Sequence, residues 1–471
     1  MNVLLINPPK ENEITGTLPS ELTEERGFSP PLGLLYIAGY LLQHTDYKIN
    51  VLDSQVEKLS YDDIKVRIRE IKPDVIGITA MTVTMLDVIE TVRIVKEVDN
   101  KIKIVLGGPH VYLFPEETID LEDIDFLVLG EGEEVFKRLL DNIDNKSELI
   151  KIPGLVFKDK DKIINTGFSN PIVDLDDLSF PARKLLPYKK YNSLLAKGNV
   201  VTTVFTSRGC PYQCSFCDRP HLGKAFRARS PKNVVDELEE CTEMGIHDFL
   251  IYDDTFTVDK QRVIKICKEI IKRKLNIAWN IRARVDTVDE EVIKNLKSAG
   301  CQGIHYGVEA GTEKILKVLR KNITLSQVKN TFFLTKKYKI SILAYFMLGN
   351  PSEDRNDIMA TFKIMRDLNP DYVHIAILTP FPGTEIYFNG LRDGYIKNDY
   401  WRDFAKNPIS GFVLPFWNEN FTRDELNALL IKGYKSFYMR PVYIIKRLLE
   451  LRSFKEMWKK SMAGLKIFIM K

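Results

Sequence analysis

Three of the six cysteines in this 471-residue chain lie within eight residues, at Cys210, Cys214 and Cys217 of the stretch SRGCPYQCSFCDRP. A four-thiolate zinc site usually takes two C-x-x-C pairs, and a structural metal site is closed by a fourth ligand. Iron–sulfur clusters instead take thiolates from closely spaced cysteines in one loop. The spacing C-x-x-x-C-x-x-C therefore predicts a 4Fe–4S cluster with one iron left open to another ligand.

The bulk composition is that of a globular protein with two or three domains. The chain has 44% hydrophobic and 28% charged residues and a net charge of +4, which indicates no particular partner. It lacks a run of about 18 apolar residues that would span a membrane. The start MNVLLINPPK has neither the basic region nor the cleavage site of a signal peptide. We therefore expect a cytoplasmic protein, in which clustered cysteines are metal ligands or catalytic groups more often than disulfides.

The first 145 residues alternate between short β-rich runs and amphipathic helical patterns. Strands are expected at 3–7, 48–53, 74–80, 103–109 and from 125, and helices at 31–43, 61–71, 84–98 and up to 140. This alternation predicts a doubly wound parallel sheet that is covered on both faces. Such sheets bind ligands at the carboxyl ends of their strands, near the point where the strand order reverses.

The residues at these strand ends suggest a large ligand. They include the stretches Asn7-Pro8-Pro9, Gly107-Gly108-Pro109-His110 and Gly130-Glu131-Gly132-Glu133, and the segment from Thr79 to Thr82. Glycine allows close approach of the backbone to a ligand, and a helix N-terminus favours anionic groups. The fingerprint G-x-G-x-x-G is absent, which argues against a nicotinamide cofactor. Ordinary βα turns, which also need glycine, are the alternative interpretation.

The second part of the chain continues as about six βα units, which predicts a partial barrel. Strands are expected at 200–207, 247–256, 276–286, 303–311, 342–354 and 371–385. Charged residues stand at the strand ends, where a βα barrel builds its active site: Asp253, Asp254, Arg282, Arg284 and Glu309. This set suits a zwitterionic ligand that carries a ribose. The alternative is a solvated rim or a salt bridge inside the barrel.

The cysteine loop follows the strand predicted at 200–207 and resembles the C-x-x-x-C-x-aromatic-C motif of the radical S-adenosylmethionine (SAM) superfamily. The N-terminal part, with its GGPH and GEGE turns, resembles the cobalamin-binding domain fused to radical SAM cores of the class B methyltransferase type. Together the two resemblances cover most of residues 1–385. They imply an α/β chain with a cobalamin-binding domain (1–145), a linker (146–199), a partial (β/α)6 radical SAM barrel (200–385) and a helical C-terminal cap with a basic tail (386–471).

The resemblance also implies roles for individual residues. Cys210, Cys214 and Cys217 would hold the 4Fe–4S cluster, and its fourth iron would bind SAM. Contacts to SAM are expected from Phe216, Asp253, Asp254, Arg284, Glu309, Gly349 and Pro351. The sequence Tyr252-Asp253-Asp254 replaces the Gly-Gly-Glu pattern that is usual for binding the SAM amino group.

Cobalamin contacts are expected from the strand ends of the first domain, at Thr82, Gly107, Gly108, Pro109, His110, Gly130, Glu131 and Gly132. The signature Asp-x-His-x-x-Gly of the methionine synthase type is missing, because the loop at 7–16 contains no histidine. We therefore expect cobalamin in its base-off form. His110 is expected to donate or accept a hydrogen bond rather than to ligate cobalt.

The activity that the resemblance implies is C-methylation of an unactivated carbon in a small or apolar substrate, through a 5′-deoxyadenosyl radical and methylcobalamin. Cyclisation or rearrangement with the same cofactors is the alternative. A non-catalytic cobalamin-dependent sensor would leave the cysteine loop without a use. The expected partner is a one-electron reductant such as flavodoxin or ferredoxin. Nucleic acid is not expected, because an RNA methylthiolating enzyme would carry cysteines before Cys210 and a C-terminal RNA-binding barrel.

The last 32 residues form a basic tail, in which nine Lys and Arg stand against two Glu between 440 and 471. Apolar residues recur there at helical spacing, at Ile444, Leu448, Leu451, Phe454, Trp458, Met462, Leu465 and Ile469. A basic amphipathic helix that contains Trp can lie in a membrane interface. The tail therefore predicts peripheral membrane contact. A terminal helix that packs on the cap with a solvated basic face is the alternative.

Overall fold

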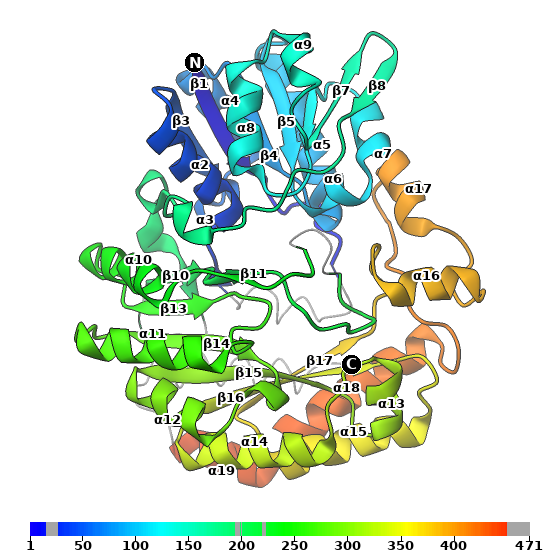
Figure 1. Ribbon diagram of the computed structural model, residues 1–471. Coiled ribbons are helices and arrows are strands. Elements are labelled where there is room, and N and C mark those ends of the chain that lie inside the picture. The colour runs from blue at the N-terminus through cyan, green and yellow to red at the C-terminus, as the bar shows by residue number, and fades with distance from the viewer. Residues whose placement is uncertain (16–26, 194–197, 199, 219–222, 450–471) are drawn as a thin grey trace.

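The computed structural model describes residues 1–15, 27–193, 198, 200–218 and 223–449, and contains two large sheets (Figure 1). A seven-stranded sheet is formed by the N-terminal part, and a six-stranded sheet by the part that follows residue 200. Two further sheets have two strands each, β2 (Gly27–Phe28) paired with β9 (Asn192–Ser193) and β11 (Ser207–Arg208) paired with β12 (Arg227–Ala228).

The N-terminal sheet has the strand order β3-β1-β4-β5-β6-β7-β8. Its parallel strands are β1 (Asn2–Asn7), β3 (Lys48–Asp53), β4 (Val75–Thr79), β5 (Lys103–Gly107) and β6 (Phe126–Val128). The strand order reverses at β1, which lies between β3 and β4. Ligands are therefore expected at the carboxyl ends of the two central strands β1 and β4. This part of the fold confirms the predicted doubly wound sheet.

Helices cover both faces of this sheet. The longer ones are α2 (Leu32–His44), α4 (Tyr61–Ile71), α5 (Met85–Val98) and α8 (Gly132–Asp141), and the shorter ones α3 (Ser54–Glu57), α6 (Pro109–Leu113), α7 (Pro115–Asp120) and α9 (Lys146–Leu149). One apolar layer contains Leu35 and Phe136 from α2 and α8, and the other contains Ile68 and Val92 from α4 and α5. The apolar run of β1 is buried because it faces both layers.

The sheet continues beyond residue 145. Strands β7 (Leu155–Asp159) and β8 (Lys162–Asn165) add to it in antiparallel orientation, β7 beside β6. The first part of the segment expected to be a linker, 146–199, therefore belongs to the N-terminal sheet. The sequence did not suggest this, because two short strands joined by a tight turn have no helix between them to mark a βα unit.

The second sheet is an open barrel of parallel strands, which lie side by side in the order in which they occur in the sequence. Its strands are β10 (Val201–Val204), β13 (Asp248–Ile251), β14 (Ala278–Ala283), β15 (Cys301–Glu309), β16 (Ser341–Leu348) and β17 (Tyr372–Ile377). The helices are α10 (Pro231–Glu243), α11 (Lys260–Lys272), α12 (Glu290–Ser298), α13 (Glu313–Val318), α14 (Leu325–Lys337) and α15 (Arg355–Leu368).

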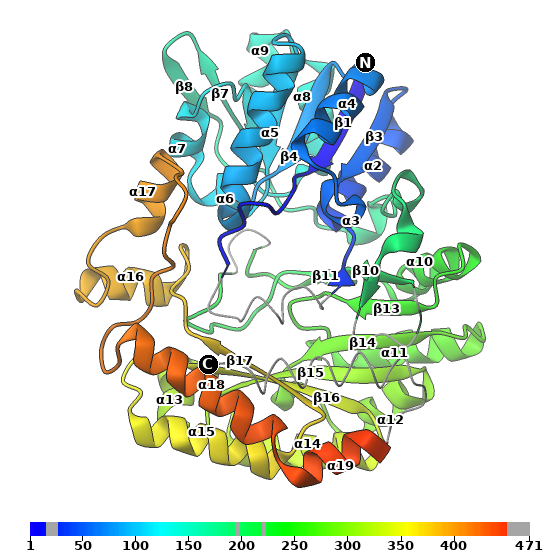
Figure 2. The same ribbon diagram turned by 180° about the vertical axis from the view of Figure 1, so that it is seen from behind.

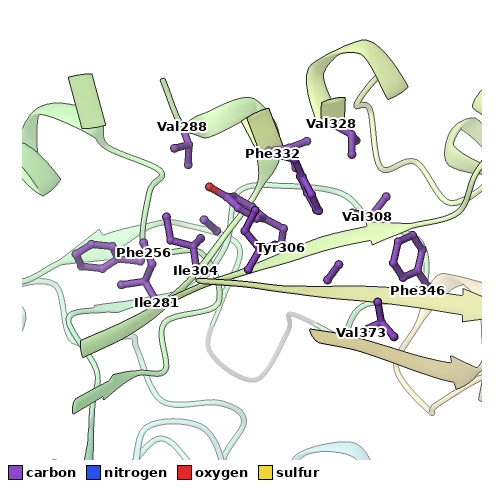
Figure 3. Packing of buried hydrophobic residues seen from close by; sticks show 14 of the residues in the cluster. Phe256, Ile281, Val288, Ile304, Tyr306, Val308, Val328, Phe332, Phe346 and Val373 are labelled. Carbon is purple, nitrogen blue, oxygen red and sulfur yellow. The ribbon is translucent and has the colours of Figure 1, made fainter. Parts of the chain in front are cut away.

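Alternating residues of the barrel strands pack against these helices. Figure 3 shows Ile281, Tyr306 and Phe346 from three neighbouring strands gathered with Phe332 of α14. The residues between them on β16, including Tyr345, are only partly buried and face the other side of the sheet. The charged residues that matter for the site stand where these strands end.

A C-terminal helical region follows the barrel, with α16 (Glu385–Arg392), α17 (Tyr400–Lys406), α18 (Arg423–Tyr438) and α19 (Pro441–Leu449). Helix α17 reaches the N-terminal part, where Arg402 pairs with Glu117 of α7 at 3.0 Å and Phe404 joins its apolar layer. Most of the tail stripe predicted between Ile444 and Ile469 lies outside the described residues, which end at 449.

Helix α18 lies along the outermost strand β17 (Figure 2). The Tyr434 hydroxyl donates to Ile375 O at 3.0 Å and accepts from Ile375 N at 3.1 Å. The Tyr438 hydroxyl does the same at Val373, at 2.9 and 3.0 Å. Two tyrosines one helical turn apart thus satisfy backbone groups that a seventh strand would otherwise pair.

Tyr434→Phe is expected to lower the free energy of unfolding by about 1–3 kcal/mol, because it leaves a buried N–H and C=O unpaired. Urea denaturation measures this as a lower transition midpoint. Tyr395→Phe is the matched control, since the exposed Tyr395 packs its ring on Trp417 and its hydroxyl does not bond to a described residue. Equal midpoints for Tyr434→Phe and the unaltered chain would contradict the role assigned to the hydroxyl.

Candidate active site

The cysteine loop begins and ends in the short hairpin of β11 and β12, where Arg208 is opposite Arg227. Gly209, next to the first cysteine, has φ +81°, and a Cβ there would lie 2.3 Å from the Ala225 carbonyl oxygen. No larger residue fits this position without displacing the backbone. The glycine of SRGC is thus required by the close approach of the two ends of the loop.

Asp253 holds the start of the loop on the barrel. Its buried carboxylate accepts hydrogen bonds from Thr206 N at 2.6 Å, Thr206 Oγ1 at 2.5 Å and Ser207 Oγ at 2.6 Å. Arg262 donates to the Thr206 carbonyl oxygen at 2.6 Å. These bonds give Asp253 a role in fixing the loop that the sequence did not suggest, and its contact with SAM stays a prediction. Asp254, the next residue, is exposed.

The three cysteines are not joined in disulfides; Cys210 and Cys214 are buried and Cys217 is exposed. Cys210 Sγ lies 3.7 Å from Thr255 Oγ1 at the end of β13. Within the described residues, no three His, Cys, Asp or Glu side chains converge on a single ion. A cluster binds each thiolate to a different iron, so three thiols on one loop fit a cluster better than a mononuclear metal.

Arg284 lies beside the cysteine loop. Its Nη1 is 3.7 Å from Cys214 Sγ, and its guanidinium stacks over the Tyr212 ring at 3.9 Å. It is oriented by Asp286, at 3.0 Å, and by the Lys321 carbonyl oxygen, at 2.6 Å. The sequence predicted that Arg284 would bind SAM. The structure brings it to a cysteine sulfur, and the contact with SAM remains a prediction.

Glu309 and Lys321 form a buried ion pair at 2.7 Å, and each side chain is 8% exposed. Glu309 has φ +72°, a rare conformation for a residue with a side chain. Gly307 makes room for the pair, since a Cβ there would lie 2.3 Å from Glu309 Oε1. The Lys321 ammonium lies 5.8 Å from the centre of the Phe216 ring, so Glu309 and Phe216 meet at one place as predicted residues of the site. Lys321 was missed because nothing in its local sequence distinguishes it from a surface lysine.

The segment after β16 forms a tight turn at the same barrel rim. Gly349 has φ +75°, and a Cβ there would lie 2.9 Å from Leu426 of α18. Glu353 accepts a hydrogen bond from Asn350 N at 2.9 Å, and burial raises the pKa of its carboxyl to about 7. Pro351 lies within this turn. The predicted SAM contact of Gly349 and Pro351 would therefore be made by a rigid backbone.

At the carboxyl end of β5, His110 is completely buried. Its Nδ1 lies 3.0 Å from Thr82 Oγ1, which joins two residues that were predicted separately. Its Nε2 has no partner among the residues that the structure describes. Burial lowers the pKa of His110 to about 4, so the ring is neutral near pH 7 and can form one more hydrogen bond.

The neighbouring Gly107 leaves room for a ligand. At Gly107 the nearest atom to an added Cβ is 3.9 Å away. Gly108 has φ +110°, and Pro109 begins α6. An open strand end beside a buried nitrogen without a partner fits a large ligand with polar groups, as expected for cobalamin. These observations support the predicted contacts without testing them.

The second predicted cobalamin turn lies against the cysteine loop. Glu131 pairs with Arg227 at 2.5 Å, and Glu133 pairs with Arg208 at 2.5 Å. Gly130 has φ +86°, and a Cβ on Gly132 would lie 3.1 Å from Ile37 Cδ1 of α2. Sequence reasoning suggested Glu131 and Gly132 from their place after a strand. The arginine partners, which are far away in the sequence, could not be deduced.

A surface hollow of about 440 Å³ lies elsewhere, between α2 and the segment 179–185. It contains none of the predicted site residues. We therefore place the site by the side chains that meet at the two sets of strand ends rather than by the size of this hollow.

Comparison with known proteins agrees with a division into an N-terminal part and a barrel part. Residues 23–140 match the B12 binding domain, and residues 204–365 match the Radical SAM superfamily. An uncharacterized methyltransferase of Pyrococcus horikoshii is 35% identical over 458 residues, which cover 96% of each chain. The anaerobic magnesium-protoporphyrin IX monomethyl ester cyclase of Rubrivivax gelatinosus is 32% identical over 455 residues, covering 94% of this chain and 78% of the cyclase.

The fold is also similar to a solved structure. The radical S-adenosylmethionine methyltransferase TsrM of Kitasatospora setae, with cobalamin and a [4Fe-4S] cluster bound, aligns with a TM-score of 0.70. The alignment covers 84% of this chain and 79% of TsrM at 18% sequence identity. At this identity the likeness concerns the arrangement of the two domains alone.

Arg284→Met is expected to lower the midpoint potential of the reconstituted cluster by about 60 mV, because a cation that donates to a thiolate stabilises the reduced cluster. The measurement is a redox titration followed by electron paramagnetic resonance. Arg282→Met, two residues earlier, serves as control, since the Arg282 guanidinium stacks on the Tyr252 ring at 4.2 Å. A potential that is equal in the two variants would contradict the assignment.

Proposed function

This chain belongs to the radical SAM enzymes that carry a cobalamin-binding domain, and we propose that it methylates an unactivated carbon in a small or apolar substrate. The family uses a 4Fe–4S cluster, SAM and cobalamin. When bound, these groups supply a 5′-deoxyadenosyl radical and a transferable methyl group. The sensor alternative does not account for the cysteine loop.

The observation that carries the proposal is the position of the cysteine loop between the two sets of strand ends. Asp253 fixes the loop to the barrel, and Glu133 fixes it to the N-terminal sheet through Arg208. Cys210, Cys214 and Cys217 would thereby hold a cluster that faces both parts. Such a position suits a reaction in which two cofactors act on one substrate, because their reactive atoms must approach each other.

The roles that we propose for other residues follow from their neighbours. Glu309, Lys321 and Phe216 would bind SAM beside the cluster, with the ion pair supplying a carboxylate and an ammonium to its polar groups. His110 would bind cobalamin through Nε2, which is free of other partners in the described structure. The neutral imidazole suits a hydrogen bond to an amide or hydroxyl group.

Methylation and cyclisation both occur among the names of the relatives. The relative that is similar over 96% of both chains is called a methyltransferase, and the second relative is called a cyclase. We favour methylation because the methyltransferase matches over almost the full length. Cyclisation or rearrangement remains the second candidate. A reductant such as flavodoxin or ferredoxin would supply the electron, as radical SAM enzymes require.

We further propose peripheral membrane contact through α19. Three side chains on one face of this helix are exposed, Val442 at 76%, Ile445 at 58% and Leu449 at 82%. Lys446 and Arg447 pair with the same carboxylate, Asp371, at 3.4 and 2.9 Å, which balances one of their two positive charges within the chain. Helices within the described ranges are all too short or too polar to cross a bilayer.

The anaerobically reconstituted protein is expected to convert SAM to 5′-deoxyadenosine in the presence of a strong reductant. Cys214→Ala should abolish this product together with the visible absorbance of the cluster, whereas Cys241→Ala, in α10, should change neither. Liquid chromatography with mass spectrometry measures the product. Extracts of cells with and without the gene are then compared for a pair of metabolites that differ by one CH2. A reconstituted protein without iron, or without 5′-deoxyadenosine, would contradict the proposal.

Val442→Ser/Ile445→Ser/Leu449→Ser is expected to reduce sedimentation with anionic phosphatidylglycerol vesicles several-fold, because it removes the exposed apolar face of α19. Zwitterionic phosphatidylcholine vesicles give the part of the binding that does not depend on charge. Equal sedimentation of the variant and the unaltered chain would count against the membrane proposal and would leave the methylation proposal unaffected.

A further inference from the structure

Four charged residues join the cysteine loop to the N-terminal sheet. Arg227 binds Glu131 through both of its terminal nitrogens, at 2.5 and 3.0 Å, and also donates to the Ile172 carbonyl oxygen at 2.5 Å. Arg208 binds Glu133 at 2.5 Å and lies 3.4 Å from Glu131. We call these four residues the interdomain clamp.

The clamp is shielded from water. Its carboxylates are 5% exposed, and its arginines are 9% and 11% exposed. Buried ion pairs contribute little net stability compared with apolar residues of the same volume, because desolvation offsets their attraction. Bidentate arginine–carboxylate pairs do fix distance and angle, since the guanidinium is planar and rigid. The effect of these pairs is therefore to fix the orientation of the cysteine loop relative to the N-terminal sheet.

The clamp lies between the two regions that are predicted to bind cofactors. Arg208 stands two residues before Cys210, and Arg227 faces it across the β11–β12 hairpin. Glu131 and Glu133 begin α8 directly after β6, at the strand ends predicted to bind cobalamin. The two arginines thus join this turn to the cysteine loop through paired charges.

The loop also has a separate attachment to the barrel through Asp253, which binds Thr206 and Ser207. Loss of the clamp would leave this attachment in place. The barrel half of the reaction, in which SAM is cleaved at the cluster, should therefore tolerate loss of the clamp. A step that spans both domains should not.

We propose that Arg208, Arg227, Glu131 and Glu133 are positioning residues that set the orientation of the cysteine loop toward the cobalamin-binding strand ends. This inference rests on the proposed function, since it assigns the clamp to the transfer between the two cofactors. The clamp residues touch the stem of the loop and act through it.

The test uses Glu133→Gln/Arg208→Met, which removes one pair, leaves Glu131 paired with Arg227, and leaves no buried charge that lacks a counterion. The control is Glu269→Gln/Arg273→Met, which removes the 2.8 Å ion pair at the end of α11 and the contacts of Arg273 with Asp236 and Glu239 of α10, all inside the barrel part. Hydrogen–deuterium exchange of the full chain without cofactors is measured first. Amides of residues 208–217 are expected to exchange about tenfold faster in the clamp variant, and those of residues 248–256 at the unaltered rate.

The second measurement uses the reconstituted holoenzyme with SAM and added cob(I)alamin. Transfer of the methyl cation from the SAM sulfonium breaks the sulfur–methyl bond, leaves the electron pair on sulfur and yields S-adenosylhomocysteine. The cobalt electron pair forms the new bond. The clamp variant is expected to form S-adenosylhomocysteine at least tenfold more slowly, with 5′-deoxyadenosine formation within twofold of the unaltered enzyme. The control variant should match the unaltered enzyme in both.

Two outcomes would overturn the proposal. One is a parallel loss of both products together with loss of bound iron, which would show that the clamp only stabilises the loop. The other is unaltered exchange and unaltered S-adenosylhomocysteine formation. An unaltered enzyme that forms neither product would contradict the proposed function, and the exchange measurement would still decide whether the clamp orders the loop.

Discussion

The site depends on a short loop that is attached at its stem to two separate sheets. Asp253 accepts three hydrogen bonds from the segment just before the cysteines, and Glu133 binds Arg208 in the same segment. Each attachment is buried, so both keep their strength in the low dielectric of the interior. Because Gly209 permits the two ends of the loop to meet, the thiols are presented at a defined place instead of moving with a free loop.

The charges at the barrel rim illustrate how far sequence reasoning can go. It located Arg284 and Glu309 because both follow apolar strands, and the structure places both near the cysteine loop. It could not supply their partners, since Asp286 stands in a three-residue 3-10 helix and Lys321 in the irregular segment between α13 and α14, both too short for a periodic pattern. The partner decides what a charge can do: Arg284 is oriented toward a sulfur, and Glu309 is neutralised by an ammonium.

The fold itself was largely predictable, because parallel strands between amphipathic helices leave a strong pattern. The helix expected at 84–98 is observed as α5, Met85–Val98. The prediction missed β7 and β8, whose antiparallel pairing depends on β6 rather than on their own residues. It also missed the clamp, because ion pairs between residues about 75 to 96 positions apart leave no local signal.

Both outer strands of the open barrel have their backbone groups covered by side chains or loops. On β17 this is done by Tyr434 and Tyr438, and on β10 by Arg183, which donates to Thr203 O at 2.8 Å. An uncovered strand is a template onto which another chain can add a strand and begin aggregation. The helix that follows the barrel thus protects it against intermolecular pairing. A chain that ended before α18 would expose the backbone N–H and C=O groups of β17 and would be prone to self-association through this strand.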